Sequence, residues 1–526
     1  MKRMAGLTLI MILVSSVVFA QPTIEWQRCL GGSKDDVRLS ATQTQDGGYI
    51  CLLKTISTDG DLTGTRSHNG DTWIVKLNST RDIEWQRVIP GGIPYSIKQL
   101  SDGSYIILGS RDDTDSIITP VHGSIDVWLV KLSAAGDINW QKCFGGSQEE
   151  IPRVIAETKD SSLIFLAQTN SSDGDLGEIS SGEVWLVKLD TMGRMKWQRR
   201  LDPSLNNNEP YGMDITTENG IIITGSGAPD SVGYGGQDLW VYKLDLMGKP
   251  QWLKWYGGSL NDQGNSIIQT TDGGYFVAGH TSSSDGEVFM NHGNGDFWCI
   301  KLSVDGTLAW ERSVGGSGLE SSGSVAEPVW CIQRKDSTDT GIIIAGNSSS
   351  RDGDFGNPFP GNTAYAIALA KLSITGKIIW TTLTGSFKND HCNSLEITSD
   401  GGILLGGTVR PDGYVIGSHN GADGWLVKLS NPTATVIPLP DFQSNIVVSP
   451  NPATAMVTIK YVALGTNAAS IKVINFLGQT VFETTDNNIS IGNREMNLDL
   501  NQLPSGFYIV KVRCGSETTN QKIVKY

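Results

Sequence analysis

A short apolar run with lysine at its fourth position recurs through most of the chain. It reads Trp-x-x-Lys-Leu, with one degenerate Ala-Leu-Ala-Lys-Leu copy, and successive copies are 55 to 70 residues apart. The seven copies begin at Trp73, Trp128, Trp185, Trp240, Trp298, Ala368 and Trp425. Runs rich in β-branched, aromatic and aliphatic side chains predict strands. A regular spacing predicts a fold built from repeats.

Three more strands complete each repeat. The strand after the run carries a second tryptophan, usually followed by glutamine, and two strands joined by an Asp-Gly turn precede the run. Asp-Gly between apolar segments is a strong hairpin signal. The second tryptophans are Trp85, Trp140, Trp197, Trp252, Trp310 and Trp380, with an extra copy at Trp26. Four antiparallel strands repeated seven times predict an all-β chain with a seven-bladed β-propeller.

The amino-terminal strand should close the ring. The strand around Trp26 precedes every Trp-x-x-Lys-Leu run, whereas the last run, at Trp425, has no such strand after it. Pairing these two segments completes one blade and leaves no open sheet edge between the ends. We therefore expect residues 21–430 to form a propeller closed by its amino-terminal strand.

The ends of the chain have different compositions. Residues 1–20 combine Lys2 and Arg3 with an apolar run and end at Ala20, which predicts a secretory signal peptide. No later segment has the roughly 18 apolar residues of a membrane helix, so no transmembrane segment is expected. Residues 431–445 are a proline-rich linker. Residues 446–526 contain short alternating strands that suit a small β-sandwich.

Several short motifs of residues 446–526 occur together in one known family. They are a Ser-Pro-Asn-Pro opening, a Gly-Gln turn, a Leu-Pro-Ser-Gly-Phe-Tyr run and a lysine-rich last strand. Their residues include Pro450, Asn451, Pro452, Gly478, Gly506, Tyr508 and Lys522. As a set they resemble the C-terminal sorting domain of type IX secretion substrates. The preceding repeats resemble uncharacterised propeller-like regions of such secreted proteins.

The resemblance implies a fold, partners and a location. The sorting domain of that family is an immunoglobulin-like β-sandwich, and its partners are the type IX secretion translocon and a sortase. An exported protein at the cell surface or outside the cell is therefore expected. The resemblance implies nothing about what the propeller does.

The net charge and the cysteines limit which ligands and cross-links are expected. A net charge of −14 argues against a nucleic acid partner. The seven cysteines form no Cys-x-x-Cys pair, so a zinc site is not expected. One or two disulfides remain open in an oxidising compartment.

Acidic loops before the Trp-x-x-Lys-Leu strands suggest a metal site. Their repeated Asp-Gly-Asp segments supply carboxylate oxygens, the ligands that calcium prefers. The candidate ligands are Asp59, Asp61, Asp173, Asp175, Asp352 and Asp354. Aspartate and glycine are also the residues that tight turns require, and the loops lack a full ligand set at fixed offsets. Turn formation is the simpler interpretation, and calcium is the one candidate cofactor.

A ligand site is expected where the repeat symmetry breaks. The unit between Trp310 and Trp380 is the longest, and the fifth unit has an unusual aromatic pair. The candidate ligand-binding residues are Trp255, Tyr256, Trp330, Glu320 and Glu327. No nucleophile elbow, His-Glu-x-x-His motif or phosphate loop occurs in the sequence.

These patterns support three interpretations of function. The preferred one is an exported surface protein whose propeller is a binding or adhesion module for a glycan or a protein. The second is a hydrolase or lyase acting on polysaccharide, which needs two carboxylates about 5 to 10 Å apart. The third is a structural surface protein without a small ligand.

Overall fold

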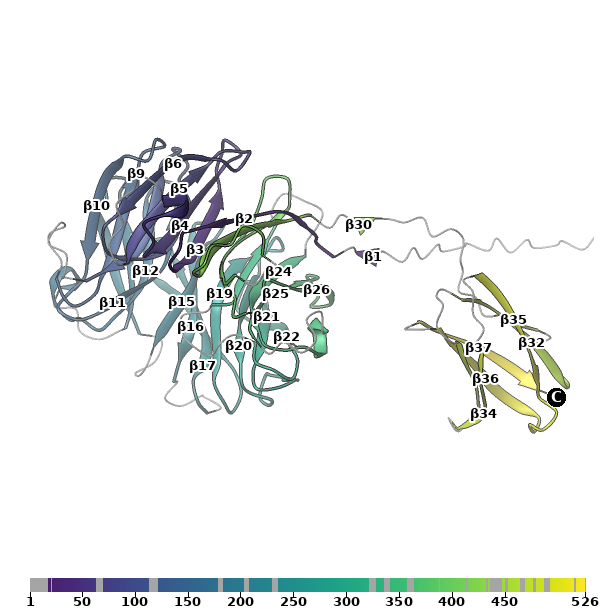
Figure 1. Cartoon of the computed structure of the whole chain (residues 1–526). Coiled ribbons are helices and arrows are strands. Elements are labelled where there is room, and N and C mark those ends of the chain that lie inside the picture. Colours follow the sequence, from purple (N-terminus) through teal and green to yellow (C-terminus); the bar gives the residue numbers. More distant parts are fainter. Residues whose placement is uncertain are drawn as a thin grey trace, which may run out of the picture. The chain divides into compact units, whose positions relative to one another are not determined.

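The computed structural model (Figure 1) describes most of the chain, in these ranges: 18–19, 21–62, 70–112, 122–177, 183–202, 208–228, 235–320, 328–334, 341–356, 364–386, 388–411, 415–431, 434–435, 447–449, 453–463, 469–475, 479–486, 492–514 and 517–525. The expected signal peptide and linker lie almost wholly outside these ranges. Contacts divide the chain into two units, Phe19–Thr433 and a second that contains Ala434–Tyr526. Each unit is described by itself.

The first unit is built from four-stranded antiparallel sheets, which we call blades. Blade 1 is β3 (Asp36–Gln43), β4 (Tyr49–Thr55), β5 (Asp71–Leu77) and β6 (Ile83–Ile89). Blade 2 is β7 (Ile93–Gln99), β8 (Tyr105–Arg111), β9 (Asp126–Leu132) and β10 (Ile138–Phe144). Blade 3 is β11 (Glu150–Glu157), β12 (Leu163–Thr169), β13 (Val184–Leu189) and β14 (Met195–Leu201). Blade 4 is β15 (Glu209–Ile215), β16 (Gly220–Gly227), β17 (Asp238–Asp245) and β18 (Pro250–Tyr256).

Three more sheets complete this unit among the described residues. Blade 5 is β19 (Asp262–Gln269), β20 (Tyr275–Thr281), β21 (Asp296–Leu302) and β22 (Leu308–Val314). Blade 6 is β23 (Trp330–Gln333), β24 (Ile342–Ser348), β25 (Ala366–Leu372) and β26 (Ile378–Thr384). Blade 7 is β27 (His391–Ile397), β28 (Ile403–Val409), β29 (Asp423–Leu429) and β2 (Ile24–Leu30). Three short 3-10 helices are η1 (Gly60–Leu62), η2 (Gly174–Leu176) and η3 (Gly353–Phe355), and β1 (Val18–Phe19) and β30 (Ala434–Thr435) are two-residue strands.

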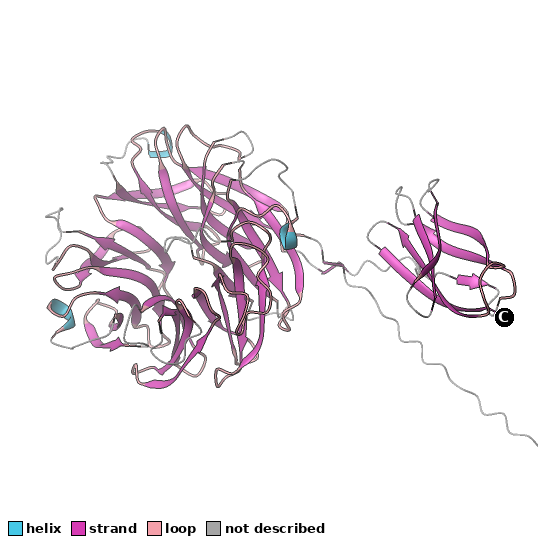
Figure 2. Ribbon diagram, turned by 90° about the horizontal axis from the view of Figure 1, so that it is seen from below, coloured by secondary structure: helices cyan, strands magenta, loops and turns pink. Residues whose placement is uncertain are grey.

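The blades form a closed ring, seen in Figure 2. The first strand of each blade contacts the first strand of the next, and β27 of blade 7 contacts β3 of blade 1. These first strands are therefore the innermost strands. β2 pairs with β29 from Ile24 opposite Leu429 to Leu30 opposite Gly424. The prediction of an all-β chain with a propeller is confirmed.

The repeated lysine has a role that the sequence did not reveal. Lys76 lies in the fully buried strand β5, and only 2% of its surface is exposed. Its ammonium binds the carboxylate of Asp46, in the Asp-Gly turn, at 2.8 Å. The same pair recurs in five blades, as Lys76 with Asp46, Lys131 with Asp102, Lys188 with Asp160, Lys301 with Asp272 and Lys428 with Asp400. Each pair therefore ties the turn between the first two strands of a blade to its third strand.

Glutamine or glutamate at the end of an innermost strand links neighbouring blades. Its side-chain oxygen accepts the backbone N–H of a turn residue in the preceding blade, at 2.7 to 2.9 Å. The donor and acceptor pairs are Gln45 with Gln99, Ser101 with Glu157, Thr217 with Gln269, Thr271 with Gln333, and Ser399 with Gln43. β15 and β27 end in isoleucine instead.

The second unit is a β-sandwich. One sheet is β31 (Val447–Ser449), β32 (Met456–Ala463) and β35 (Gly492–Asp499), and the other is β34 (Thr480–Asp486), β33 (Ala469–Asn475), β36 (Gly506–Cys514) and β37 (Glu517–Lys525). Ile459 of the first sheet and Val510 of the second belong to one buried core. The small sandwich expected in the carboxyl-terminal part of the chain is therefore confirmed.

The sorting motif is only partly described. Gly506 begins β36, and the buried Tyr508 donates its hydroxyl to the carbonyl of Pro504 at 2.7 Å. Pro450, Asn451, Pro452 and Gly478 lie outside the described residues, as does the side chain of Lys522.

Cysteines and helices complete the picture. All six cysteines with described side chains are buried and unbridged: Cys29, Cys51, Cys143, Cys299, Cys331 and Cys392. Among the described residues, no helix has the length and apolar character needed to cross a membrane.

Candidate functional site

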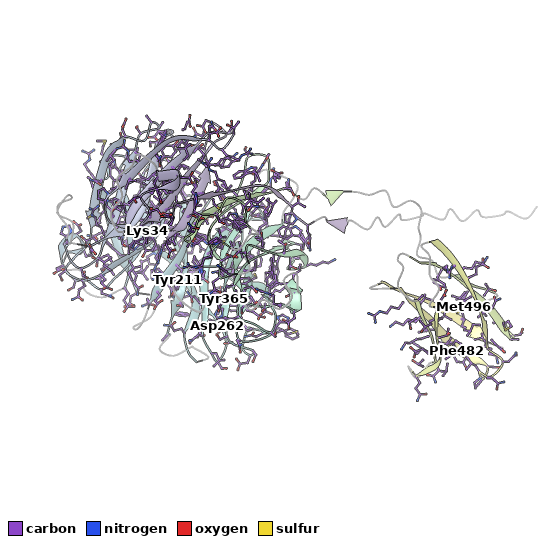
Figure 3. All side chains as sticks on the ribbon, viewed as in Figure 1. Lys34, Tyr211, Asp262, Tyr365, Phe482 and Met496 are labelled. Carbon is purple, nitrogen blue, oxygen red and sulfur yellow. The ribbon has the colours of Figure 1, made fainter. Side chains whose placement is uncertain are left out.

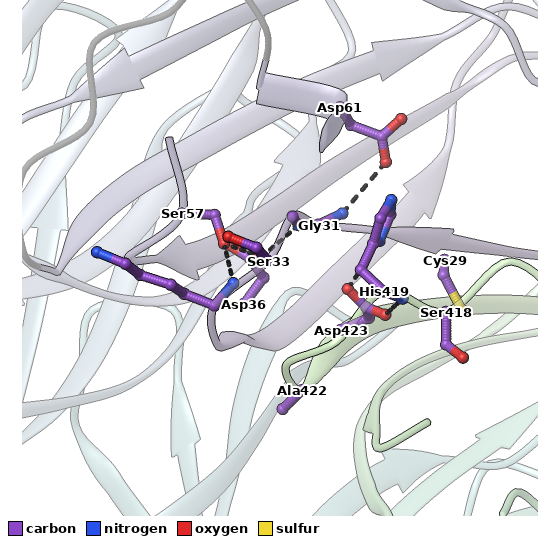
Figure 4. A network of polar contacts seen from close by, with 12 residues as sticks. Cys29, Gly31, Ser33, Asp36, Ser57, Asp61, Ser418, His419, Ala422 and Asp423 are labelled. Carbon is purple, nitrogen blue, oxygen red and sulfur yellow. Dashed lines mark hydrogen bonds and ion pairs between the residues drawn. The ribbon is translucent and has the colours of Figure 1, made fainter. Parts of the chain in front are cut away.

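At several junctions between blades, acidic side chains accept hydrogen bonds from the loop that leads into the next blade. In the 31–33 loop the first N–H donates to Asp61 at 3.2 Å, as Figure 4 shows. The second donates to Asp36 at 2.8 Å and the third to Asp59 at 2.7 Å. Each carboxylate thus accepts one amide from a loop that has no ladder partner of its own. We call this arrangement the acidic clamp.

The acidic clamp recurs at three more junctions. Loop 145–147 donates to Asp175, Glu150 and Asp173, loop 257–259 to Glu287, Asp262 and Asp285, and loop 315–317 to Asp354, Glu320 and Asp352, at 2.7 to 3.2 Å. All six aspartates that the sequence suggested as metal ligands therefore bind backbone amides. In the described part of the chain, no group of three or more His, Cys, Asp or Glu side chains could hold a metal ion.

A second buried carboxylate faces each clamp across its first glycine. A Cβ on Gly145 would lie 2.2 Å from Asp126 Oδ1 and 2.4 Å from Glu150 Oε2, and both carboxylates are fully buried. The four pairs are Asp36 with Asp423, Glu150 with Asp126, Asp262 with Asp238, and Glu320 with Asp296. Burial raises the pKa of Asp36, Asp126, Asp262, Asp296, Glu320 and Asp423. Such pairs favour protonation of one member.

Glu320 should make stability depend on pH near neutrality. Burial and the nearby Asp296 carboxylate raise the pKa of Glu320 from 4.5 to about 7. Because the folded state holds this proton more tightly, its contribution is complete below pH 4.5 and is lost as pH rises through about 7. Wild type should lose about 2 kcal/mol of unfolding free energy between pH 5.5 and pH 8 through this group, and Glu320→Gln should not. The stability of Glu320→Gln relative to wild type should therefore rise by about 2 kcal/mol over this interval, as measured by urea unfolding at both pH values.

The exposed member of the same clamp supplies the control. Hydrogen bonds from Ser317 lower the pKa of Asp352, so this group stays ionised across the interval. The stability difference between Asp352→Asn and wild type should therefore be the same at both pH values. A Glu320→Gln difference that also stays constant would contradict the assignment.

Histidines brace the loops before three of the paired aspartates. The backbone N–H of His292 donates to Asp296 at 2.9 Å, and its ring Nδ1 lies 2.5 Å from the same carboxylate. His419 makes both contacts with Asp423, at 2.5 and 3.0 Å. The backbone N–H of His122 donates to Asp126 at 2.7 Å. These contacts are repeated, so they are part of the scaffold.

The residues suggested as a ligand site do not come together. Trp255 lies on the outer strand of blade 4, where Tyr256 is buried and donates its hydroxyl to the Gly306 carbonyl. Trp330 begins the innermost strand of blade 6 and packs against a different hydrophobic cluster from Trp255. Glu320 belongs to an acidic clamp, and Glu327 lies outside the described residues.

A different set of side chains marks the innermost strands. Most of these strands carry a β-bulge near their start, which leaves one residue without a ladder partner and redirects its side chain. In β7, β11, β15, β19 and β27 the bulged residues are Tyr95, Arg153, Tyr211, Asn265 and Asn393. The bulge of β3 contains two residues, Arg38 and Leu39, and Arg38 has a φ of 62°.

Four of these residues form what we call the Arg–Tyr array: Arg38, Tyr95, Arg153 and Tyr211. They come from four consecutive blades and alternate in type. The Arg38 guanidinium lies 6.0 Å from the Tyr95 ring centroid, and that of Arg153 lies 4.8 Å from the Tyr211 ring centroid. Cation–π contacts of this kind contribute about 0.5 to 2 kcal/mol each.

Hydrogen bonds to neighbouring polar side chains position two members of the array, Arg153 and Tyr211. Arg153 Nη2 donates to Gln168 Oε1 at 2.8 Å, whereas Arg153 Nε is buried without a hydrogen-bond partner. Tyr211, labelled in Figure 3, donates its hydroxyl to Glu209. Burial lowers the pKa of Arg153, and burial together with Glu209 raises the pKa of Tyr211. Arg153 is therefore a half-buried cation whose Nε has no acceptor among the described residues.

The array can bind acidic or planar groups. A guanidinium matches a carboxylate or sulfate in shape and charge, and phenol rings offer flat faces with a polar edge. The sequence contains a signal for this site. When the seven innermost strands are aligned, one position varies as Leu39, Tyr95, Arg153, Tyr211, Asn265, Val329 and Asn393, and in the first strand the array member is the residue before it, Arg38.

Comparisons with known proteins identify the carboxyl-terminal unit. Residues 447–526 match the family model described as the secretion system C-terminal sorting domain. No curated protein matches the chain.

Three solved structures with some likeness to this chain are distant from it in sequence. A DUF4221 family member from Bacteroides vulgatus is 10% identical, with a TM-score of 0.35 over 79% of this chain and 99% of that one. A puromycin hydrolase is 10% identical, with a TM-score of 0.43 over 82% and 59% of the two chains. PorZ, a surface component of the type IX secretion system of Porphyromonas gingivalis, is 10% identical, with a TM-score of 0.24 over 97% and 86%. TM-scores this low carry no argument about function.

The residues that match the sorting-domain model include β36, the strand that contains the motif residues Gly506 and Tyr508. The chain therefore carries a secretion system C-terminal sorting domain and is a type IX secretion substrate, exported to the cell surface or beyond it.

Proposed function

We propose that the propeller is a binding module of the exported protein and that the Arg–Tyr array binds acidic groups of a glycan or protein ligand. The observation that carries the proposal is the alternation of two arginines and two tyrosines on the innermost strands of four consecutive blades. This alternation breaks the repeat symmetry, as a binding site for one ligand must.

The carboxylate pairs favour binding over hydrolysis. A glycosidase needs two acids that reach one sugar bond, one of them as a proton donor. Asp36, Asp126, Asp262 and Glu320 and their partners are buried, and the clamp acids accept amides of their own loops. Their geometry serves the scaffold, so the enzyme interpretation has no acid pair to use among these groups.

The test is a binding assay on the full mature chain. We expect saturable binding to polygalacturonate or chondroitin sulfate, both polyanionic, and little binding to neutral dextran. Arg153→Ala should weaken the binding of the acidic polymer about tenfold or more, because a charge-assisted bond is lost. Product analysis on the same samples should find the polymer intact.

Arg199 offers a matched control. Its guanidinium also lies over an aromatic ring, 5.5 Å from the Trp197 centroid, but on the outer strand of blade 3. Arg199→Ala should therefore leave binding unchanged. Equal binding by the Arg153→Ala and Arg199→Ala variants would refute the array as the site, and cleaved polymer would support the hydrolase interpretation.

A further inference from the structure

A tryptophan and a glutamine are hydrogen-bonded in three blades. The indole N–H donates to the glutamine oxygen in the pairs Trp73 with Gln86 at 2.9 Å, Trp185 with Gln198 at 2.7 Å and Trp425 with Gln27 at 2.9 Å. In blades 1 and 3 the glutamine amide also donates to a carbonyl of the short helix, that of Asp61 at 3.2 Å or Asp175 at 2.7 Å. The bonds satisfy both side chains in a part-buried setting.

Blade 2 has both residues but lacks the bond. Trp128 Nε1 and Gln141 Oε1 are buried and have no hydrogen-bond partner among the described residues. Leaving such groups unsatisfied costs about 1 to 3 kcal/mol each, so they need an explanation. Their equivalents in blades 1, 3 and 7 show that the same sequence can satisfy them.

The junction between blades 1 and 2 also differs in charge. Gly92 stands where the clamps of blades 1, 3 and 5 have Asp36, Glu150 and Asp262. Arg111 stands where those blades have the threonines that bind the clamp acids, and its guanidinium lies 5.4 Å from the Trp128 ring centroid. This junction has therefore lost the clamp acid and gained an arginine, while Asp71 stays buried and accepts the Gly91 N–H at 3.0 Å.

A groove opens at this junction. Its volume is about 150 Å³, and its lining residues are Arg87, Val88, Ile89, Pro90, Arg111, Ile138 and Gln141. The Arg87 guanidinium already holds an exposed carboxylate, that of Asp137, at 3.0 Å. A cavity of this size accommodates one six-membered ring. The groove thus combines apolar side chains with two arginines, one of them paired with Asp137, and with Gln141.

We propose that this groove is a second ligand site, which takes one hydroxy-acid group such as a single uronic acid residue. The carboxylate of the ligand pairs with Arg87, and one of its hydroxyls donates to Gln141 Oε1. The carbon ring packs on Val88 and Ile138. Arginine is suited to the carboxylate because its planar fork matches both oxygens. The proposal does not rest on the Arg–Tyr array, which lies on other strands.

The test is calorimetric titration of the full mature chain with glucuronate and, in parallel, with glucose, which lacks the carboxylate. Glucuronate should bind, and glucose should bind at least about tenfold more weakly. Gln141→Leu should weaken glucuronate binding by about fivefold or more, since a bond to a buried acceptor is lost. Gln198→Leu removes the equivalent glutamine from blade 3, where its oxygen already accepts the Trp185 indole N–H, and should leave the affinity unchanged.

Two further variants keep the test decisive. Arg87→Ala changes a partly exposed side chain, so it tests the carboxylate contact even if Gln141→Leu fails to fold. Arg153→Ala should keep glucuronate binding in the groove while it loses polygalacturonate, which separates the two proposed sites. Equal binding of glucuronate and glucose, or unchanged affinity in both groove variants, would overturn the proposal.

Discussion

A chain without residues 21–30 should lose most of the stability of the propeller. These residues contain β2, the outer strand of blade 7, and its ladder with β29 joins the two ends of the first unit. Leu30 is fully buried, Trp26 packs edge-on against Tyr49 at 5.0 Å, and Gln27 accepts the Trp425 indole N–H. The deletion exposes the long edge of β29 and opens blade 7, whose strands come from both ends of the first unit.

The expected loss is about 5 kcal/mol or more, against typical domain stabilities of 5 to 15 kcal/mol. Urea unfolding of the mature chain with and without residues 21–30, followed by tryptophan fluorescence, measures it. Ile24→Ala is the control, because this side chain is 45% exposed and should cost under about 1 kcal/mol. An unchanged midpoint for the deletion would show that the ring does not depend on β2.

The fold could be predicted because its signals are local and repeated. Apolar runs and Asp-Gly turns each specify a strand or a hairpin within about ten residues. The role of the lysine could not be predicted in the same way. The partner of Lys76, Asp46, lies 30 residues earlier in the sequence and reaches it only when β3, β4 and β5 pair.

The acidic loops were ambiguous because one composition serves two purposes. Asp59 and Asp61 have the residue types of a calcium site and of a tight turn. What distinguishes the two is the partner of each oxygen, and here the partners are the amides of the 31–33 loop. That loop enters the strand from the preceding blade, so its position depends on the assembled ring.

The Arg–Tyr array escaped prediction for a geometric reason. Side-chain direction in a strand is inferred by alternation, and a bulge shifts that alternation by one residue. Arg153 and Tyr211 are 58 positions apart, and they meet only because β11 and β15 are neighbours in the ring. Trp255 and Trp330 were predicted to bind a ligand, but they pack against hydrophobic clusters of different blades.

Substituting Gly145 by alanine should destabilise the propeller by about 3 to 5 kcal/mol, although the change adds one methyl group. The new Cβ would stand within 2.4 Å of oxygens from both Asp126 and Glu150. Glu150 also accepts the Gly146 N–H at 2.7 Å and the Thr169 hydroxyl at 2.7 Å, so its displacement breaks two bonds to a fully buried group. Each buried polar group left unsatisfied costs about 1 to 3 kcal/mol.

Gly103→Ala separates this steric effect from backbone strain. Gly103 has a φ of 81° and no heavy atom within 4 Å of its would-be Cβ, so alanine there should cost only the positive-φ strain, about 1 kcal/mol. Gly145 has no positive φ, so its cost must come from the two carboxylates. Urea unfolding of both variants compares them directly. If Gly145→Ala were no worse than Gly103→Ala, the carboxylate pair could move aside freely, and the clamp would not be the rigid joint between blades 2 and 3.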